Sequence, residues 1–151
     1  MAECRIAIRI VAGDADVAAC LRLRRTVFIE EQGVSEAEEI DGLDPECLHV
    51  LATEEQVPVA AARIRKIDII AKIQRVCVLP SHRKRGLGTR VIEFVLDRVA
   101  EDPAIRLARL GAQTHAIDFY RKLGFIPVGP EYMDAGIPHR DMEIEIADGR
   151  P

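Results

Sequence analysis

Three features that mark common functional classes are absent from this sequence. None of its 4 cysteines forms a Cys-x-x-Cys pair, so neither a zinc site nor a disulfide framework is indicated. No apolar run is long enough to cross a bilayer, and charged residues stand near the start, where a signal peptide would turn apolar. The formal net charge is −4, which argues against nucleic acid as a partner. These absences predict a protein of the reducing cytoplasm, with no membrane or nucleic-acid partner and no metal.

What the sequence does contain is a steady alternation of patterned segments over its 151 residues. Hydrophobic residues make up 48% of the chain, which argues against disorder. A chain of this length buries roughly 70% of its unfolded surface when it folds as one unit. We found no internal repeat, linker or low-complexity tract. We therefore expect a single domain over residues 1–151.

A basic stretch with two glycines, Arg-Lys-Arg-Gly-Leu-Gly-Thr at residues 83–89, separates two strongly patterned segments. Residues 73–79 before it are apolar and rich in β-branched side chains, whereas Val91, Val95 and Val99 after it recur at helical spacing. The first turn of a helix offers unpaired N–H groups and a positive dipole end, which favour an anion. Glycines allow close approach and the basic residues add charge. The stretch predicts a diphosphate site, with an ordinary surface turn as the alternative.

Two familiar nucleotide-binding loops do not fit these residues. A Walker loop needs a lysine directly after its second glycine, and here Gly88 is followed by Thr89. A dinucleotide fingerprint needs a third glycine three residues after the second, and that position is Val91. Neither loop type is therefore expected.

The stretch does resemble the Arg/Gln-x-x-Gly-x-Gly/Ala pyrophosphate loop of the GNAT acetyltransferase superfamily, which Arg83, Gly86 and Gly88 match. The preceding residues 75–80, Arg-Val-Cys-Val-Leu-Pro, are similar to the valine-rich strand that the family places there. Downstream, residues 113–125 resemble the family's helix that ends in Tyr-x-x-x-Gly-Phe. Two motifs in the right order and spacing are much more specific than either motif alone.

A finer resemblance, to the ElaA-like branch of the superfamily, rests on residues 25–34, residues 39–44 and His49. In that branch the corresponding helix and loop line the acceptor side of the site. The acyl-homoserine-lactone synthases share the fold and a similar Arg-x-x-Val-Phe stretch. Residues 35–44 are rich in carboxylates, and they fit either a solvated loop or an acidic rim that attracts a cationic amine.

The resemblance implies an α/β (α+β) architecture. Its parts are a mixed, mostly antiparallel sheet of about seven strands, helices on both faces, and a V-shaped splay between the two central strands. It also implies a bulge whose free N–H groups, at Val76 and Val78, bind the pantetheine arm of acetyl-CoA, the cosubstrate. The residues implied in cofactor binding are Val76, Cys77, Val78, Arg83, Lys84, Arg85, Gly86, Leu87, Gly88, Thr89, Gln113, Phe119 and Tyr120.

Acetyl transfer from a thioester to an amine needs a neutral amine, a donor for the oxyanion and a proton for the departing thiolate. The resemblance places Tyr120 at the thiolate as general acid, the alternative being an aromatic side chain packed in the core. It makes a backbone N–H near Val76 the oxyanion donor. Gln113 either hydrogen-bonds the amide arm of the cofactor or caps a helix.

The general base is harder to assign. Many family members carry a glutamate on the bulged strand, where this sequence has Gln74 and Arg75. Glu31 would act from the helix that faces the site, and His139 fits the ElaA-like pattern at the acceptor pocket. Histidine has the most suitable intrinsic pKa for a base. A water chain or an amine that binds already neutral would also suffice. The full set of candidate bases is Glu31, Asp41, Asp44, His49 and His139.

Local patterns predict the elements around these motifs. The predicted elements are a strand at 5–11, a helix from Asp14 or Asp16 as N-cap to Gln32, and strands at 48–53, 57–65 and 67–79. Further along, they are a strand at 105–111, a helix at 113–123, a strand at 125–128, a loop bracketed by Gly129-Pro130 and Gly136-Ile137-Pro138, and a strand at 142–146.

The function expected from the resemblance is an acetyl-CoA-dependent N-acetyltransferase that acts directly on a primary amine of a small molecule or peptide, with a homodimer left open. One alternative is a non-catalytic acyl-CoA sensor, which the missing strand glutamate favours and Tyr120 disfavours. Another is an acyl-homoserine-lactone synthase. The glycine loop argues against it, because a full pyrophosphate site implies coenzyme A rather than an acyl carrier protein.

Overall fold

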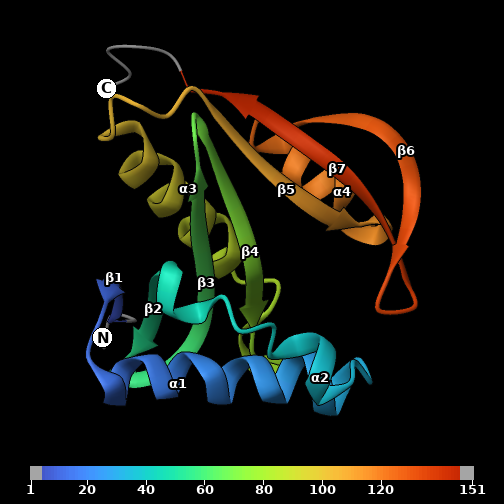
Figure 1. Cartoon of the computed structure of the whole chain (residues 1–151). Helices are drawn as coiled ribbons and strands as arrows, with labels where there is room; N and C mark the ends of the chain where they lie inside the picture. Colours follow the sequence, from blue (N-terminus) through green and yellow to red (C-terminus); the bar gives the residue numbers. More distant parts are fainter. Residues whose placement is uncertain (1–4, 147–151) are drawn as a thin grey trace.

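The structure, a computed structural model, describes residues 5–146. Its centre is a seven-stranded sheet in the order β1-β2-β3-β4-β5-β7-β6 (Figure 1). Neighbouring strands are antiparallel except β4 and β5, which run parallel. The mixed, mostly antiparallel sheet is thereby confirmed. The strands are β1 (Ile6–Val11), β2 (Leu48–Glu54), β3 (Val57–Ile67), β4 (Ile70–Val78), β5 (Leu107–Gln113), β6 (Ile126–Asp134) and β7 (Ile137–Glu145).

Helices cover both faces of this sheet, as expected. One layer contains α1, η1 and α2, and the other contains α3 and α4 (Figure 1). The helical elements are α1 (Asp14–Arg24), the π-helical turn η1 (Arg25–Glu31), α2 (Glu36–Glu39), η2 (Asp44–Glu46), η3 (Pro80–His82), α3 (Leu87–Ala100), η4 (Thr114–Ala116) and α4 (Ile117–Lys122).

Each face of the sheet has its own apolar core, because side chains alternate between faces along a strand. The larger core joins the apolar stripe of α3 to strand residues such as Ile64 and Ile73. The smaller core joins Cys20 and Leu23 of α1 to Leu51, among others. The small side chains at the centre of β3, residues 60–62, are all buried and let helices approach both faces closely.

The two parallel strands at the centre separate after a short stretch of pairing. β4 and β5 pair only from Ile70 opposite Leu107 to Lys72 opposite Arg109. Beyond these residues the strands diverge, so the two halves of the sheet open like a V (Figure 1). The expected splay is therefore confirmed, and it exposes backbone of both strands to a common cleft.

The first helix differs in detail from the prediction. It reaches the expected end, but from Arg25 onward it widens into the π-helical turn η1, with Gln32 as its C-cap. The N-cap is Gly13 rather than Asp14 or Asp16, and no side chain caps the helix. Asp16 instead pairs with Arg9 of β1 at 3.0 Å. π-Helical turns are rare and are frequently found at functional sites.

The predicted loop between Gly129 and Pro138 is wrong. β6 and β7 are both nine-residue strands, joined by a tight turn at Ala135 and Gly136 with positive φ at both positions. The Gly129-Pro130 pair lies where the register between the strands shifts. A glycine followed by a proline marks a bulge as readily as a loop, because both residues tolerate an interrupted ladder.

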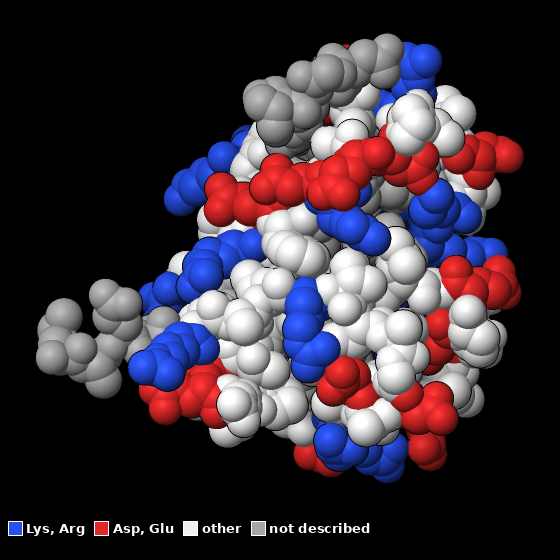
Figure 2. Space-filling view, turned by 90° about the vertical axis from the view of Figure 1, so that its left-hand side faces the viewer, with Lys and Arg blue, Asp and Glu red and all other residues white. Residues whose placement is uncertain are grey.

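Charges of both signs are interspersed among uncharged side chains on the face shown in Figure 2. Among the described residues, no helix has the length and apolar character needed to cross a membrane.

Packing of the larger core predicts that alanine substitutions at two adjacent residues change the free energy of unfolding by very different amounts. Phe125 is 1% exposed and packs edge-to-face on Tyr120, whereas Ile126 is 62% exposed. Phe125→Ala should lower the free energy of unfolding by about 3–5 kcal/mol through the cavity it leaves. Ile126→Ala should change it by less than about 0.5 kcal/mol. Urea denaturation measures both values, and equal effects of the two changes would contradict this packing.

Candidate active site

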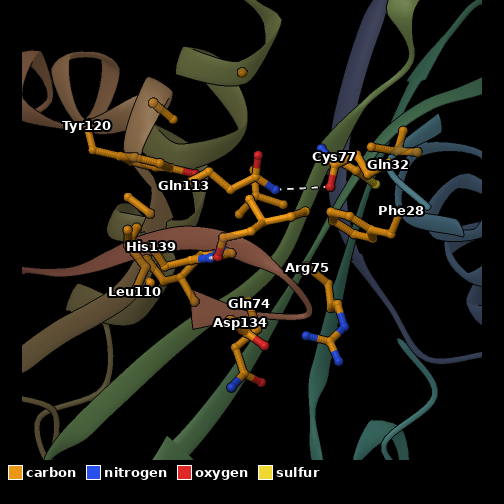
Figure 3. A pocket seen from close by; sticks show the side chains of 18 of the residues that line it. Phe28, Gln32, Gln74, Arg75, Cys77, Leu110, Gln113, Tyr120, Asp134 and His139 are labelled. Atoms are coloured by element: carbon orange, nitrogen blue, oxygen red, sulfur yellow. Dashed lines mark hydrogen bonds between the residues drawn. The ribbon is translucent and has the colours of Figure 1, made fainter. Parts of the chain in front are cut away.

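A cleft of about 890 Å³ opens where β4 and β5 separate. Its walls come from η1, β4, the loop before α3, β5, α4 and the β6–β7 hairpin. In Figure 3, Tyr120 and His139 enter the cleft from one side, and Cys77 and Arg75 of β4 lie across from them. Segments far apart in the sequence therefore share one cavity.

The expected bulge is present in β4. Ala61 of β3 pairs with Cys77 and Arg63 pairs with Gln74, so the two residues between, Arg75 and Val76, oppose only one residue of β3. Arg75 has a φ of 55°, which for a residue other than glycine costs on the order of 1–3 kcal/mol. A bulge leaves backbone groups without ladder partners, so it can present N–H groups to a ligand.

The glycine loop leads directly into the first turn of α3. Lys84 and Gly86 both have positive φ, and α3 begins immediately after Gly86 at Leu87. The N–H groups of a helix's first turn lack intrahelical partners and lie at the positive end of the dipole. A Cβ atom at Gly88 would meet the Phe119 ring at 3.3 Å, so a side chain there would crowd the wall of the cleft.

Most, but not all, of the predicted cofactor residues line the cleft. Arg85 and Leu87 do not: Leu87 is 4% exposed in the larger core, and Arg85 contacts Glu54 at 3.4 Å. The thiol of Cys77 packs in the smaller core, where burial raises its pKa to about 12. The predicted cofactor residues that line the cleft are Val76, Cys77, Val78, Arg83, Lys84, Gly86, Gly88, Thr89, Gln113, Phe119 and Tyr120.

Tyr120 is held rigidly at the back of the cleft. It is 8% exposed and packs edge-to-face against Phe119 and Phe125, with ring centroids 4.9 and 5.8 Å away. Burial raises the pKa of its hydroxyl to about 12. The hydroxyl therefore keeps its proton at neutral pH and is able to donate it.

His139 lies on β7, opposite Gln113 of β5. Its Nδ1 lies 2.7 Å from the carbonyl oxygen of Ile137. A carbonyl can only accept, so Nδ1 carries the proton and Nε2 of the neutral ring holds the lone pair. The Tyr132 ring stacks on the imidazole, with 5.9 Å between the ring centroids, and limits the orientation of the imidazole.

Tyr132 belongs to this group although the sequence pattern did not single it out. Its hydroxyl donates to Asp141 at 2.6 Å, and the side chain lies over Gly111. A Cβ at Gly111 would come within 2.5 Å of that hydroxyl, so a larger residue there would displace the Tyr132 side chain from this position. Burial, followed by the hydrogen bond to Asp141, raises the pKa of Tyr132 above its usual range.

Gln113 is the last residue of β5 rather than part of the following helix. Its Nε2 donates to Oε1 of Gln32 at 3.0 Å, a bond drawn across the cleft in Figure 3. Its Oε1 accepts from Nε2 of His115 at 2.7 Å. The side chain therefore faces the cleft, as expected of a cofactor ligand, but it is engaged by Gln32.

Glu31 lines the cleft next to the glycine loop, and its carboxylate is bound by Arg83. Both oxygens accept from the guanidinium at 2.6 Å. The hydrogen bonds from Arg83 lower the pKa of Glu31. A carboxylate held in this way is a weak base, so the geometry does not favour Glu31 as the group that deprotonates an amine.

The acidic segment divides into two parts: Glu36 and Glu38 are exposed on α2, as expected of a solvated segment, whereas Glu39, Asp41 and Asp44 are bound by arginines. Arg24 is 1% exposed and binds both carboxylate oxygens of Glu39, at 2.9 and 3.0 Å. It also donates to Asp44 at 2.7 Å. Removing one partner of a buried pair of this kind costs about 3–5 kcal/mol. Arg24, which interrupts the apolar face of its helix in the sequence, was the signal for this network.

The same network reaches the bulge. Arg63 is fully buried and binds Asp41 at 2.8 Å, Asp44 at 2.9 Å and the side-chain oxygen of Gln74 at 2.6 Å. Arg75 donates to Glu39 at 2.6 Å. These contacts hold the strained residue of the bulge in place.

The network also removes its carboxylates from the candidate bases. Hydrogen bonds from Arg63 hold the pKa of Asp41 well below its usual range. Burial tends to raise the pKa of Asp44, but hydrogen bonds from Arg24 and Arg63 outweigh it and lower the value. His49 donates from Nε2 to the Asp44 carbonyl at 2.9 Å and is buried away from the cleft-lining residues. Among the five candidate bases, His139 has the geometry that suits the role.

Comparison with known proteins agrees with this arrangement. The family described as "Acetyltransferase (GNAT) domain" matches residues 17–146. The uncharacterized protein YyaT of Bacillus subtilis is 40% identical over 143 residues, 93% of this chain and 96% of the relative. Protein ElaA of Escherichia coli is 35% identical over 133 residues, 85% of this chain and 86% of ElaA.

Solved structures share the fold over nearly the whole chain. The crystal structure of Escherichia coli ElaA has a TM-score of 0.83 at 31% identity, covering 92% of this chain and 99% of that one. An aminoglycoside 6'-N-acetyltransferase complexed with coenzyme A has a TM-score of 0.75 at 23% identity, covering 96% of this chain and 99% of that one. The chain therefore belongs to the GNAT acetyltransferase family, whose fold binds acyl-CoA, and within it to the ElaA-like branch.

Proposed function

We propose that this protein is an N-acetyltransferase that moves an acetyl group from acetyl-CoA directly to a primary amine of a small molecule or peptide. The observation that carries the proposal is the convergence of three features on one cleft. These are the bulge at Arg75, the helix start after Gly86, and the buried hydroxyl of Tyr120. We retain the predictions of a single domain and a cytoplasmic location, with a homodimer left open.

The residues present fit the cosubstrate. The N–H groups at the start of α3, beside Lys84, suit the linked phosphates. The backbone of Val76 and Val78 suits the amide-containing pantetheine arm. Gln113 and Phe119 line the same passage. Acetyl-CoA, when bound, supplies the activated acetyl thioester.

Tyr120 is proposed as the general acid. It donates its proton to the sulfur of the leaving thiolate, and its packing against two aromatic rings fixes the direction of the hydroxyl. A backbone N–H at Val76 is proposed as the oxyanion donor, because bulge amides are fixed in position before the reaction begins.

His139 is proposed as the general base, or as the group that orients a water molecule toward the amine. The contact with the Ile137 carbonyl keeps Nε2 as a proton acceptor. The acceptor amine would enter between the β6–β7 hairpin and the layer of η1 and α2, where Tyr132, Asp134 and Asp141 line the cleft.

The proposal is tested by a panel of amines. Acetyl-CoA with polyamines, amino sugars, amino acids and short peptides should release free thiol with at least one acceptor, and mass spectrometry should detect an acetyl group added to its nitrogen. Coenzyme A binding without turnover on the whole panel would instead favour the non-catalytic sensor.

Removal of the Tyr120 hydroxyl should affect chemistry more than binding. Tyr120→Phe keeps the aromatic packing, so kcat should fall by about 10²-fold or more while the affinity for coenzyme A changes less than about threefold. Steady-state kinetics and calorimetry measure the two quantities. An unchanged kcat would remove the acid assignment.

The pH profile gives a second readout for the same residue. Because burial raises the pKa of Tyr120 to about 12, its hydroxyl stays protonated well above neutrality and is lost only as pH approaches that value. The rate of the wild-type enzyme should therefore show no decline that is due to Tyr120 below about pH 10. A decline at lower pH that disappears in Tyr120→Phe would contradict the raised pKa.

His139→Gln should lower kcat by about 10-fold to 10²-fold, because glutamine offers no basic nitrogen. Acceptors of low amine pKa, which bind already neutral, should be affected least. Measuring kcat for two acceptors that differ in amine pKa checks this. An equal loss for both acceptors would assign His139 to positioning rather than to proton transfer.

A further inference from the structure

Two consecutive residues at the end of η1 are bonded to opposite walls of the cleft. Glu31 binds Arg83, in the loop that follows β4, and Gln32 binds Gln113, at the end of β5. The acyl-CoA passage runs between these two strands. Arg83 and Gln113 are also among the residues expected to bind the cofactor, and each is already bonded to one of two consecutive residues, Glu31 and Gln32.

The geometry of Arg83 leaves no edge of its guanidinium available for bidentate binding. Nη1 and Nη2 each donate to one oxygen of Glu31 at 2.6 Å, which occupies the edge of the guanidinium formed by these two nitrogens. Nε donates to the Val78 carbonyl at 2.9 Å, which occupies the other edge, the one that includes Nε. A phosphate is bound most strongly through two parallel N–H groups, so in this arrangement Arg83 cannot bind one in that way.

The ion pair is exposed enough to be exchanged. The side chains of Arg83 and Glu31 are 37% and 38% exposed, and an ion pair of this kind contributes little to stability because water screens it. Glu31 also shares the cavity wall with Lys84, Gly86 and Thr89, so the ion pair stands beside the start of α3.

We propose that Glu31 and Gln32 form a clasp that competes with the cofactor for Arg83 and Gln113. In the free protein the clasp ties η1 to both walls of the cleft. When the cofactor binds, Arg83 exchanges the carboxylate of Glu31 for phosphate oxygens, and Gln113 exchanges the Gln32 amide for the cofactor's amide arm. This inference rests on the proposed function, and it gives Glu31 a role in cofactor entry instead of in proton transfer.

The clasp has a consequence for affinity. If the ion pair between Glu31 and Arg83 is formed in part of the molecules, only the remaining fraction can bind coenzyme A through Arg83. The apparent dissociation constant then equals the intrinsic one divided by that fraction, so it is higher. Loss of the Glu31 charge should therefore tighten binding, although it removes an ion pair. Substitutions in a ligand pocket usually weaken binding, which makes this outcome distinctive.

The test is calorimetric titration of the full chain with coenzyme A. Glu31→Gln should lower the dissociation constant by roughly threefold or more. The matched control is Glu30→Gln, which removes the same charge from the adjacent residue. Glu30 lies outside the cleft lining, and its contact with Arg25 is 4.0 Å long. The control should stay within about twofold of the wild-type protein.

The same titration in an Arg83→Met background separates competition from simple repulsion. Arg83→Met should weaken binding by itself, and Glu31→Gln should then give no further gain. A gain that persists without Arg83 would mean that Glu31 only repels the phosphates, and the competition for Arg83 would be overturned. Binding that is weakened by Glu31→Gln, or that matches Glu30→Gln, would also overturn the clasp.

Failure of the clasp and failure of the proposed function give different results. If coenzyme A binds the wild-type protein and no amine is acetylated, the transferase proposal fails while the comparison of Glu31→Gln with its control still decides the clasp. If amines are acetylated and Glu31→Gln does not tighten binding, the clasp alone fails. If coenzyme A does not bind the wild-type protein, both are overturned.

Discussion

The separation of β4 from β5 after three residue pairs is the constraint on which the rest of the site depends. Parallel strands that stayed paired would satisfy each other's N–H and C=O groups and leave no room for a ligand. Once they diverge, the backbone of β4 faces a cavity, and the bulge at Arg75 turns it further out of the ladder. The cleft is therefore shaped mainly by the course of the main chain, through the divergence of the strands and the bulge.

A partly buried network of charges holds the bulge in place. Three arginines and three carboxylates meet between α1, the segment around α2, and strands β3 and β4, and their formal charges cancel. Burying such groups is tolerable only because each one has several hydrogen-bonded partners. Arg75, the strained residue of the bulge, belongs to this network. The position of the bulge is therefore coupled to that of the layer formed by α1, η1 and α2. The members are Arg24, Glu39, Asp41, Asp44, Arg63 and Arg75.

The network also explains why the site has few free carboxylates on the side of η1 and α2. Glu39, Asp41 and Asp44 are bound by arginines, and Glu31 is bound by Arg83. Glu38 also lines the cleft on this side, where it is exposed and bonded to Ser35. Further polar groups line the cleft from the opposite side, on the β6–β7 hairpin. That hairpin carries the proposed base, His139. In the proposed mechanism one wall therefore carries the clasp, and the other receives the amine.

Much of the fold followed from local patterns because its elements are strongly patterned. The helix after the glycine loop, the β2–β3 hairpin and the strand with the bulge lie where they were expected, and Gly86 has the positive φ that its place before α3 requires. The hairpin of β6 and β7 was mistaken for a loop because Gly129-Pro130 and Gly136 break the alternation that identifies strands. Pairing with β5 overrides those local signals, since β7 is hydrogen-bonded on both sides.

The sequence by itself determined the family, the helix start after Gly86 and the position of Tyr120 on the helix before Gly124, because each depends on residues that are close together in the chain. Only the tertiary structure decided which charges are free. The pairs Arg83–Glu31 and Gln32–Gln113 join residues 52 and 81 positions apart, and no local pattern encodes such distances. The partner of a charged side chain is decided by the assembled fold. The sequence shows the same Asp or Glu whether water or a buried arginine surrounds its carboxylate.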